Sequence, residues 1–287
     1  MTAEVLTARR ARCQARHGLG ELWARVESRG WLVGAAPRVV VQVGVGGDEG
    51  LVADTVHGLT AFLRSRLGVG KVEVLEFQGG DWSPLPTLTV SPADALEMVG
   101  IAEPRVTLPL LWFEPFFLVT VTNVRTDPAA RLSGVLYAQA EALRAVDWRA
   151  SRPSLVYEAH RLGGSDLAVA CGAALGQGWW LASASDVAVD RAIAHAAGLD
   201  PTTLPDLRAV ARHEVVPAVG LVEKLPELRG AAGPCWRATL AGAREGLVSA
   251  ARFVAHDVRS VRRNIRRVPH AVRRRLPALL RRGGNEA

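Results

Sequence analysis

The sequence lacks paired cysteines, and this absence narrows the classes of protein to consider. Its three cysteines, Cys13, Cys171 and Cys235, are far apart, and none forms a CxxC pair. Zinc knuckles and ferredoxin-type clusters need closely spaced cysteines, so we expect no iron–sulfur cluster and no metal site. Whether the protein binds another cofactor is unknown from the sequence. An odd number of cysteines without a disulfide framework is typical of a reducing compartment.

Long apolar runs are also missing. No stretch approaches the roughly 18 uninterrupted apolar residues of a membrane-spanning helix. The longest apolar zone, residues 108–121, is interrupted by Pro109, Glu114 and Pro115. The N-terminus lacks the charged start and apolar run of a signal peptide. The expected location is therefore cytoplasmic.

The positive charge is concentrated at one end of the chain. The 287 residues carry a formal charge of +7, with 35 basic and 28 acidic residues. Residues 257–287 hold ten arginines and two acidic residues, which leaves 25 basic and 26 acidic residues in the rest. The body is therefore close to neutral, and the tail carries the basicity.

The hydrophobic pattern of the body predicts an α/β fold. A run of β-branched residues after Arg38 predicts a buried strand, and a glycine-rich turn follows at residues 46–50. Val52, Val56, Leu59 and Leu63 share one face of a predicted helix, and residues 71–77 alternate as a strand. This β–turn–α–β order is typical of a parallel sheet. Further strands are predicted at residues 115–124, 154–157 and 166–171, and helices at 92–99, 129–146 and 186–197.

These elements define the expected domain organisation. We expect a helical lead-in over residues 1–35, an α/β domain over residues 36–230, and a helical, Arg-rich extension over residues 231–287. The fold class is α/β, with a mainly parallel sheet flanked by helices and a basic C-terminal helical extension.

Three segments together resemble the domain-of-unknown-function 362 family. The first is VVVQVGVGGDEG with the helix and strand that follow, and the second is VTNVRTDPAARLSG. The third is ASDVAVD from Ala184 to Asp190, followed by Gly198-Leu199-Asp200-Pro201 and Leu204-Pro205. The resemblance covers roughly residues 38–212. It implies an α/β fold and an accessory or ligand-binding protein, with a site role for Asp186 or Asp190.

The chain departs from the family pattern at two places. Gln42-Val43-Gly44 stands where the family has Lys-Pro-Asn, and Arg125-Thr126-Asp127 stands where it has a Lys-Thr-His type motif. The ferredoxin-like modules of some members are absent from the sequence. Asp186 and Asp190 match the family's late segment, but Val187 replaces its proline.

The candidate catalytic residues are Asp186, Asp190 and His160. The two aspartates are four residues apart, so they share one helix face and could bind a cation or act in acid–base chemistry. Alternatively, Asp186 caps the helix and Asp190 pairs with an arginine. His160 is predicted on a loop beside Glu158, where it would be either a general base or a solvated side chain.

The candidate ligand-binding residues are Arg125, Gly46 and Gly47. Arg125 follows a predicted strand end, where it could bind a carboxylate or phosphate or pair with Asp127. The glycine loop could hold an anion or simply connect strand to helix. The alternative function is an enzyme acting on an anionic small molecule, with a site built from Arg125, His160, Asp186 and Asp190. This hypothesis loses its basis if the four side chains do not converge in one pocket.

Two aromatic pairs, Trp112-Phe113 and Trp179-Trp180, are predicted in loops, as a binding wall or as core anchors.

The tail is predicted to form a basic amphipathic helix. Apolar residues repeat every three or four positions from Val258 to Val272. The candidate contact residues are the arginines between and after them: Arg259, Arg262, Arg263, Arg266, Arg267, Arg273, Arg274 and Arg275. Such a helix binds an anionic membrane surface, here the inner face, or an acidic protein partner. Non-specific nucleic-acid binding is less favoured, because the tail has no aromatic residue to stack on bases.

Overall fold

The computed structural model describes residues 2–11, 14–32, 38–44, 49–75, 82–90, 95–98, 106–127, 131–144, 152–174 and 177–220. All of these lie in one compact unit, Met1–Gly233. Gly46, Gly47 and the whole Arg-rich tail lie outside the described residues.

The centre of this unit is a seven-stranded sheet with the order β2-β12-β11-β8-β3-β4-β5. Its strands are β2 (Leu6–Ala11), β3 (Arg38–Val43), β4 (Lys71–Leu75), β5 (Thr87–Leu88), β8 (Phe117–Asn123), β11 (Leu167–Ala174) and β12 (Gln177–Ser183). The pairs from β11 to β5 are parallel, whereas β12 runs antiparallel to both β11 and β2. The predicted α/β class with a mainly parallel sheet is confirmed.

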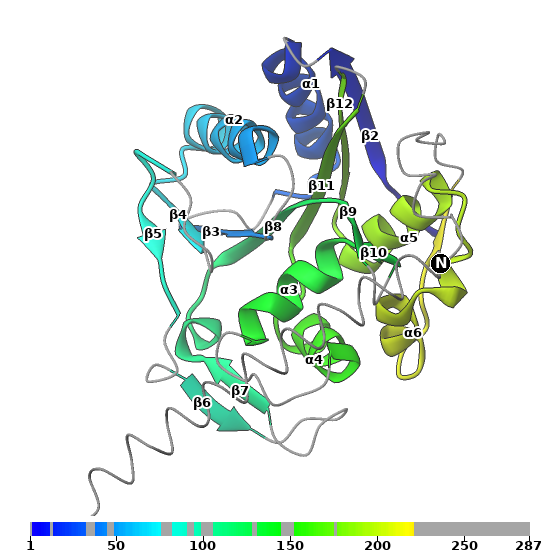
Figure 1. Ribbon diagram of the computed structural model, residues 1–287. Helices are drawn as coiled ribbons and strands as arrows, with labels where there is room; N and C mark the ends of the chain where they lie inside the picture. Colours follow the sequence, from blue (N-terminus) through cyan, green and yellow to red (C-terminus); the bar gives the residue numbers. More distant parts are fainter. Residues whose placement is uncertain are drawn as a thin grey trace, which may run out of the picture. The chain divides into compact units, whose positions relative to one another are not determined.

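Helices cover both faces of the sheet (Figure 1). One face packs against α1 (Ala15–Ser28) and α2 (Glu49–Leu67) through a large apolar core that includes Trp23, Leu59 and Trp180. The other face packs against α3 (Val135–Arg144), α4 (Arg152–Gly163), α5 (Asp186–Ala196) and α6 (Pro205–Ala211). Trp179 belongs to this second core, because neighbouring residues of a strand point to opposite faces.

Short elements complete the unit. Three two-stranded sheets pair β1 (Thr2–Ala3) with β13 (Ala218–Val219), β6 (Ala95–Met98) with β7 (Val106–Pro109), and β9 (Arg125–Asp127) with β10 (Arg131–Ser133). The 3₁₀ helices are η3 (Leu110–Phe113) and η4 (Pro201–Thr203). None of the described helices is both long and apolar enough to span a bilayer.

Some predictions of secondary structure were wrong. The predicted helix at 129–146 includes strand β10 before α3. The predicted helical lead-in contains strand β2 before helix α1, and the predicted helix at 92–99 includes strand β6. The predicted strand at 154–157 lies within helix α4. The predicted aromatic loop at Trp179-Trp180 is the middle of strand β12, where both rings are buried as core residues.

An ion pair between Arg152 and Asp206 joins helices α4 and α6. Arg152 donates from Nε to Asp206 Oδ1 at 3.0 Å and from Nη2 to Asp206 Oδ2 at 2.7 Å. The guanidinium carbon also lies 3.8 Å from the centre of the Tyr137 ring on α3. This arginine therefore ties three helices together.

Candidate functional site

The structure brings together two of the predicted catalytic residues, His160 and Asp186. Asp186 is the first residue of α5, and His160 lies near the end of α4 rather than on the predicted loop. His160 Nδ1 is 2.9 Å from Asp186 Oδ2, and its Nε2 is 3.3 Å from Glu214 Oε2. An imidazole with a carboxylate at each nitrogen is best satisfied when both nitrogens carry protons.

The electrostatics of this cluster favour the charged imidazolium. Burial acts to lower the pKa of His160, but the hydrogen bonds and negative charges of Asp186 and Glu214 outweigh it and raise the pKa above its ordinary value. Next to it, the Tyr157 ring stacks on His213, with ring centres 4.2 Å apart. The cluster thus links α4, α5 and the segment after α6. Within the described residues, no group of three His, Cys, Asp or Glu side chains is placed to hold a metal ion.

Asp190 faces a different partner from Asp186. Its two carboxylate oxygens accept the backbone N–H groups of Val135, at 2.8 Å, and Leu136, at 3.1 Å, at the start of α3. Burial is the main cause that raises the pKa of Asp190 to about 7, and the charges of Asp206 and Asp186 raise it further, although the two N–H groups oppose this. Asp190 therefore anchors the first turn of α3.

Gly134 makes this contact between helices possible. A Cβ at residue 134 would lie 2.2 Å from Asp190 Oδ1. Only glycine leaves room there for the carboxylate, so the sequence Ser133-Gly134 before α3 is matched to Asp190 on α5.

The predicted ligand-binding residues Arg125, Gly46 and Gly47 cannot be located relative to His160, Asp186 and Asp190. The backbone of Arg125 lies in β9, opposite Ser133 of β10, but its side chain lies outside what the structure describes. Gly46 and Gly47 also lie outside it. Four side chains would have to converge to form the predicted enzyme site. Of these, His160 and Asp186 lie in contact, whereas Asp190 binds the backbone at the start of α3.

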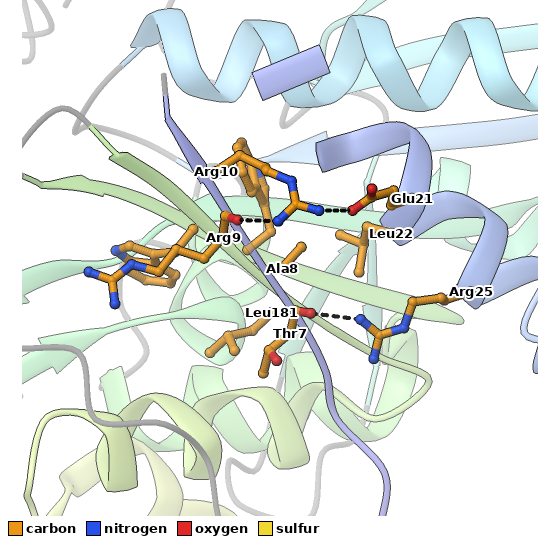
Figure 2. A pocket seen from close by; sticks show the side chains of 10 residues that line it. Thr7, Ala8, Arg9, Arg10, Glu21, Leu22, Arg25 and Leu181 are labelled. Atoms are coloured by element: carbon orange, nitrogen blue, oxygen red, sulfur yellow. Dashed lines mark hydrogen bonds and ion pairs between the residues drawn. The ribbon is translucent and has the colours of Figure 1, made fainter. Parts of the chain in front are cut away.

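A second candidate site was not found by sequence reasoning. A groove of about 300 Å³ lies where strand β2, helix α1 and strand β12 meet. It is lined by Thr7, Ala8, Arg9, Arg10, Glu21, Leu22, Arg25, Trp179, Trp180 and Leu181. We call it the arginine groove (Figure 2).

Arg10 and Arg25 supply the positive charge of the arginine groove. Arg25, on α1, donates from Nη1 to the Thr7 carbonyl at 2.8 Å. Arg10 donates from Nη1 to the Arg9 carbonyl at 3.2 Å, and its Nη2 pairs with Glu21 on α1. Among the described residues, no carboxylate forms an ion pair with Arg25. The groove therefore holds a guanidinium whose charge is not neutralised by a neighbouring side chain.

One signal in the sequence pointed to this groove. Leu6 and Ala8 alternate with polar residues, as in a strand, and Glu21 and Arg25 share one face of the following helix. The adjacent Arg9 and Arg10 break the alternation and made the segment look helical. Only the pairing of β2 with β12, far along the chain, brings the strand to the sheet edge.

The fold and the two sites define an α/β protein with a mixed, mainly parallel sheet. No protein-family model and no curated protein matches the chain. Among solved structures, it is similar to the lactate racemase apoprotein from Thermoanaerobacterium thermosaccharolyticum, with a TM-score of 0.33 and 12% sequence identity. The match covers 48% of this chain and 43% of that one, so the chain spans less than half the length of that protein. A similarity of this extent says nothing about the activity of this chain.

Proposed function

We propose that this protein is an accessory or ligand-binding protein that takes a small anionic molecule in the arginine groove. The observation that carries the proposal is the Arg25 guanidinium, which lines an open groove without a carboxylate partner among the described residues. Guanidinium groups bind carboxylates and phosphates through paired, charge-assisted hydrogen bonds. A groove of about 300 Å³ lies at the lower end of the range typical of small-molecule sites.

The groove suits ligand binding better than the His160 cluster does. Both ring nitrogens of His160 are already engaged by carboxylates, and a ligand anion there would be repelled by Asp186 and Glu214. In the arginine groove positive charge exceeds negative charge, because the guanidinium groups of Arg10 and Arg25 are accompanied by a single carboxylate, that of Glu21.

Replacing Arg25 with glutamine tests this function. We expect isothermal titration of the full chain with glutarate and with inorganic phosphate to show saturable binding for at least one of them. Arg25→Gln is expected to weaken that binding about tenfold or more, because hydrogen bonds to charged groups contribute about 1.5–3 kcal/mol. Arg64→Gln, at an exposed arginine on α2, is the matched control and should bind like the wild type. Saturable binding that Arg25→Gln leaves unchanged, or no binding at all, would contradict the proposal.

The second part of the proposal concerns family and location. We propose a divergent relative of the domain-of-unknown-function 362 family, held at the cytoplasmic membrane face by its tail. The match of Asp186 and Asp190 to the family's late segment supports the first point. The neutral body and the ten arginines of residues 257–287 support the second. An acidic protein partner and non-specific nucleic-acid binding remain the alternatives for the tail.

An enzyme acting on an anionic small molecule is the second candidate. The hydrogen bond between His160 and Asp186 favours it, because a carboxylate that orients an imidazole is a common feature of general bases. The predicted result is exchange of C–H hydrogens of a small keto acid in D₂O, followed by proton NMR. The rate should rise with pH as His160 loses its proton, above its ordinary pKa of 6.5. Exchange that persists in His160→Gln, or that never occurs, would exclude this role for His160.

A further inference from the structure

The arginine groove runs along the outer edge of the central sheet. Among the described residues, β2 pairs with β12 alone, so its other edge faces the groove. The carbonyls of Thr7 and Arg9 accept side-chain hydrogen bonds from Arg25 and Arg10, which places these carbonyls on the outer edge. In an antiparallel pair, the N–H and C=O of one residue point to the same side. The N–H groups of Thr7 and Arg9 therefore also point outward.

The strand sets the spacing of the two carbonyls that hold the guanidinium groups. Each guanidinium group is hydrogen-bonded to a carbonyl, and the two carbonyls belong to residues two apart, which corresponds to roughly 6.7 Å along a strand. In Figure 2, Ala8 and Leu22 lie between the guanidinium groups of Arg10 and Arg25, while Arg9 projects away from Arg10. The groove thus has two cationic ends and an apolar middle.

The two ends differ in how their charge is compensated. Arg25 has no carboxylate partner among the described residues, whereas Arg10 pairs with Glu21. That pair is exposed, with side chains 41% and 48% accessible, and exposed ion pairs contribute little to stability. A ligand carboxylate can therefore replace Glu21 at Arg10. Glu21 keeps a partner on its own helix, because His17 Nε2 lies 3.4 Å from its Oε1.

We propose that the arginine groove selects extended dianions, with two carboxylates joined by a short apolar chain. One carboxylate binds Arg25, the other displaces Glu21 from Arg10, and the methylene groups lie over Ala8 and Leu22. An extended chain advances about 1.25 Å per C–C bond, because bonds of about 1.5 Å zigzag at tetrahedral angles, so roughly six carbons span the spacing of the two carbonyls that hold the guanidinium groups. Adipate is therefore the matching length, and glutarate is one carbon shorter. This inference rests on the proposed function, since it names the ligand class of the same groove.

The test is a series of carboxylates of increasing length, titrated into the full chain. Adipate is expected to bind at least tenfold more tightly than malonate and than hexanoate, which has the apolar chain but one charge. Arg10→Gln should reduce dianion affinity to that of hexanoate and leave hexanoate unchanged. Arg25→Gln should weaken both ligands. Glutamine keeps the β and γ carbons of Arg10, which lie against Gly18, and circular dichroism with thermal melting verifies that both variants are folded.

Glu21→Gln gives an independent readout. It removes the carboxylate that competes for Arg10, so dianion affinity should rise a few-fold while hexanoate affinity stays the same. Hexanoate and adipate binding equally tightly, both dependent on Arg25, would overturn the dianion inference and leave the anion-binding function standing. Binding that is independent of Arg25 would overturn both.

Discussion

Asp190→Asn is expected to gain about 4 kcal/mol of stability relative to the wild type as the pH rises from about 4 to about 8. The pKa of Asp190 is raised from 3.8 to about 7 in the folded protein, and each unit of difference corresponds to about 1.4 kcal/mol. Between these values the folded state holds a proton that the unfolded state has released. Wild-type stability therefore falls with rising pH across this window, and asparagine, which does not titrate, removes this contribution.

The measurement is urea unfolding of both proteins at several pH values. Asparagine places an NH₂ group against one of the two N–H donors of α3, which adds a constant cost of about 1–3 kcal/mol at every pH. Asp200→Asn is the control, because the pKa of Asp200 is lowered in the folded protein whereas that of Asp190 is raised. The N–H of Thr202 lowers the pKa of Asp200, so its contribution is lost only as the pH falls below the ordinary value. A difference between wild type and Asp190→Asn that does not change with pH would show that folding does not raise the pKa of Asp190.

Replacing four of the ten arginines of the tail is expected to weaken binding to anionic membranes about a thousandfold. Each basic residue near an anionic surface contributes about 1 kcal/mol, so replacing four arginines with glutamine removes about 4 kcal/mol, or roughly a thousandfold in affinity. The variant carries Arg262→Gln, Arg263→Gln, Arg266→Gln and Arg267→Gln in the full chain. The measurement is flotation with liposomes of phosphatidylserine and phosphatidylcholine, at low and high salt.

The controls for flotation separate the membrane from other partners. Liposomes of phosphatidylcholine alone should not float the wild type, and high salt should release it from anionic liposomes. If the wild type does not float under any condition, the tail is not a membrane anchor. Duplex DNA and acidic proteins are then the partners to measure, and binding to DNA should fall steeply with salt.

The centre of the sheet was predictable because its strands are buried on both faces. The β-branched run after Arg38 became β3, the alternating segment after Lys71 became β4, and Phe117–Asn123 became β8. β3 and β8 read as near-continuous apolar runs and β4 as an alternating segment, and the local sequence shows both patterns directly. Helix α5 was also predicted correctly, and Ser185 caps it through a hydrogen bond with the Ala188 N–H.

The edge of the sheet and the candidate sites depend on contacts that no local pattern records. Residues 154–157 read as a strand because Leu155, Val156 and Tyr157 are consecutive and apolar, but all three are buried within helix α4. The spacing of Asp186 and Asp190 predicted one shared helix face. It did not reveal that each carboxylate would meet a different helix, which required knowing where α3 and α4 pack. Glu214 and Arg25 have no motif around them, so only the folded chain shows their role.

The pairing of β2 with β12 links ligand binding to the folding of the whole unit. Arg9 pairs with Trp179, so the wall of the groove forms only when segments 170 residues apart in the chain have come together. Contacts of this sequence separation are slow to form, because the intervening chain must be ordered first. An unfolded or half-folded chain has no groove, and a ligand held there stabilises only the completed sheet. At a hundred times its dissociation constant, such a ligand adds about 2.7 kcal/mol to the stability of the fold. If the proposed function holds, strand β2 couples the abundance of the folded protein to the concentration of the anion.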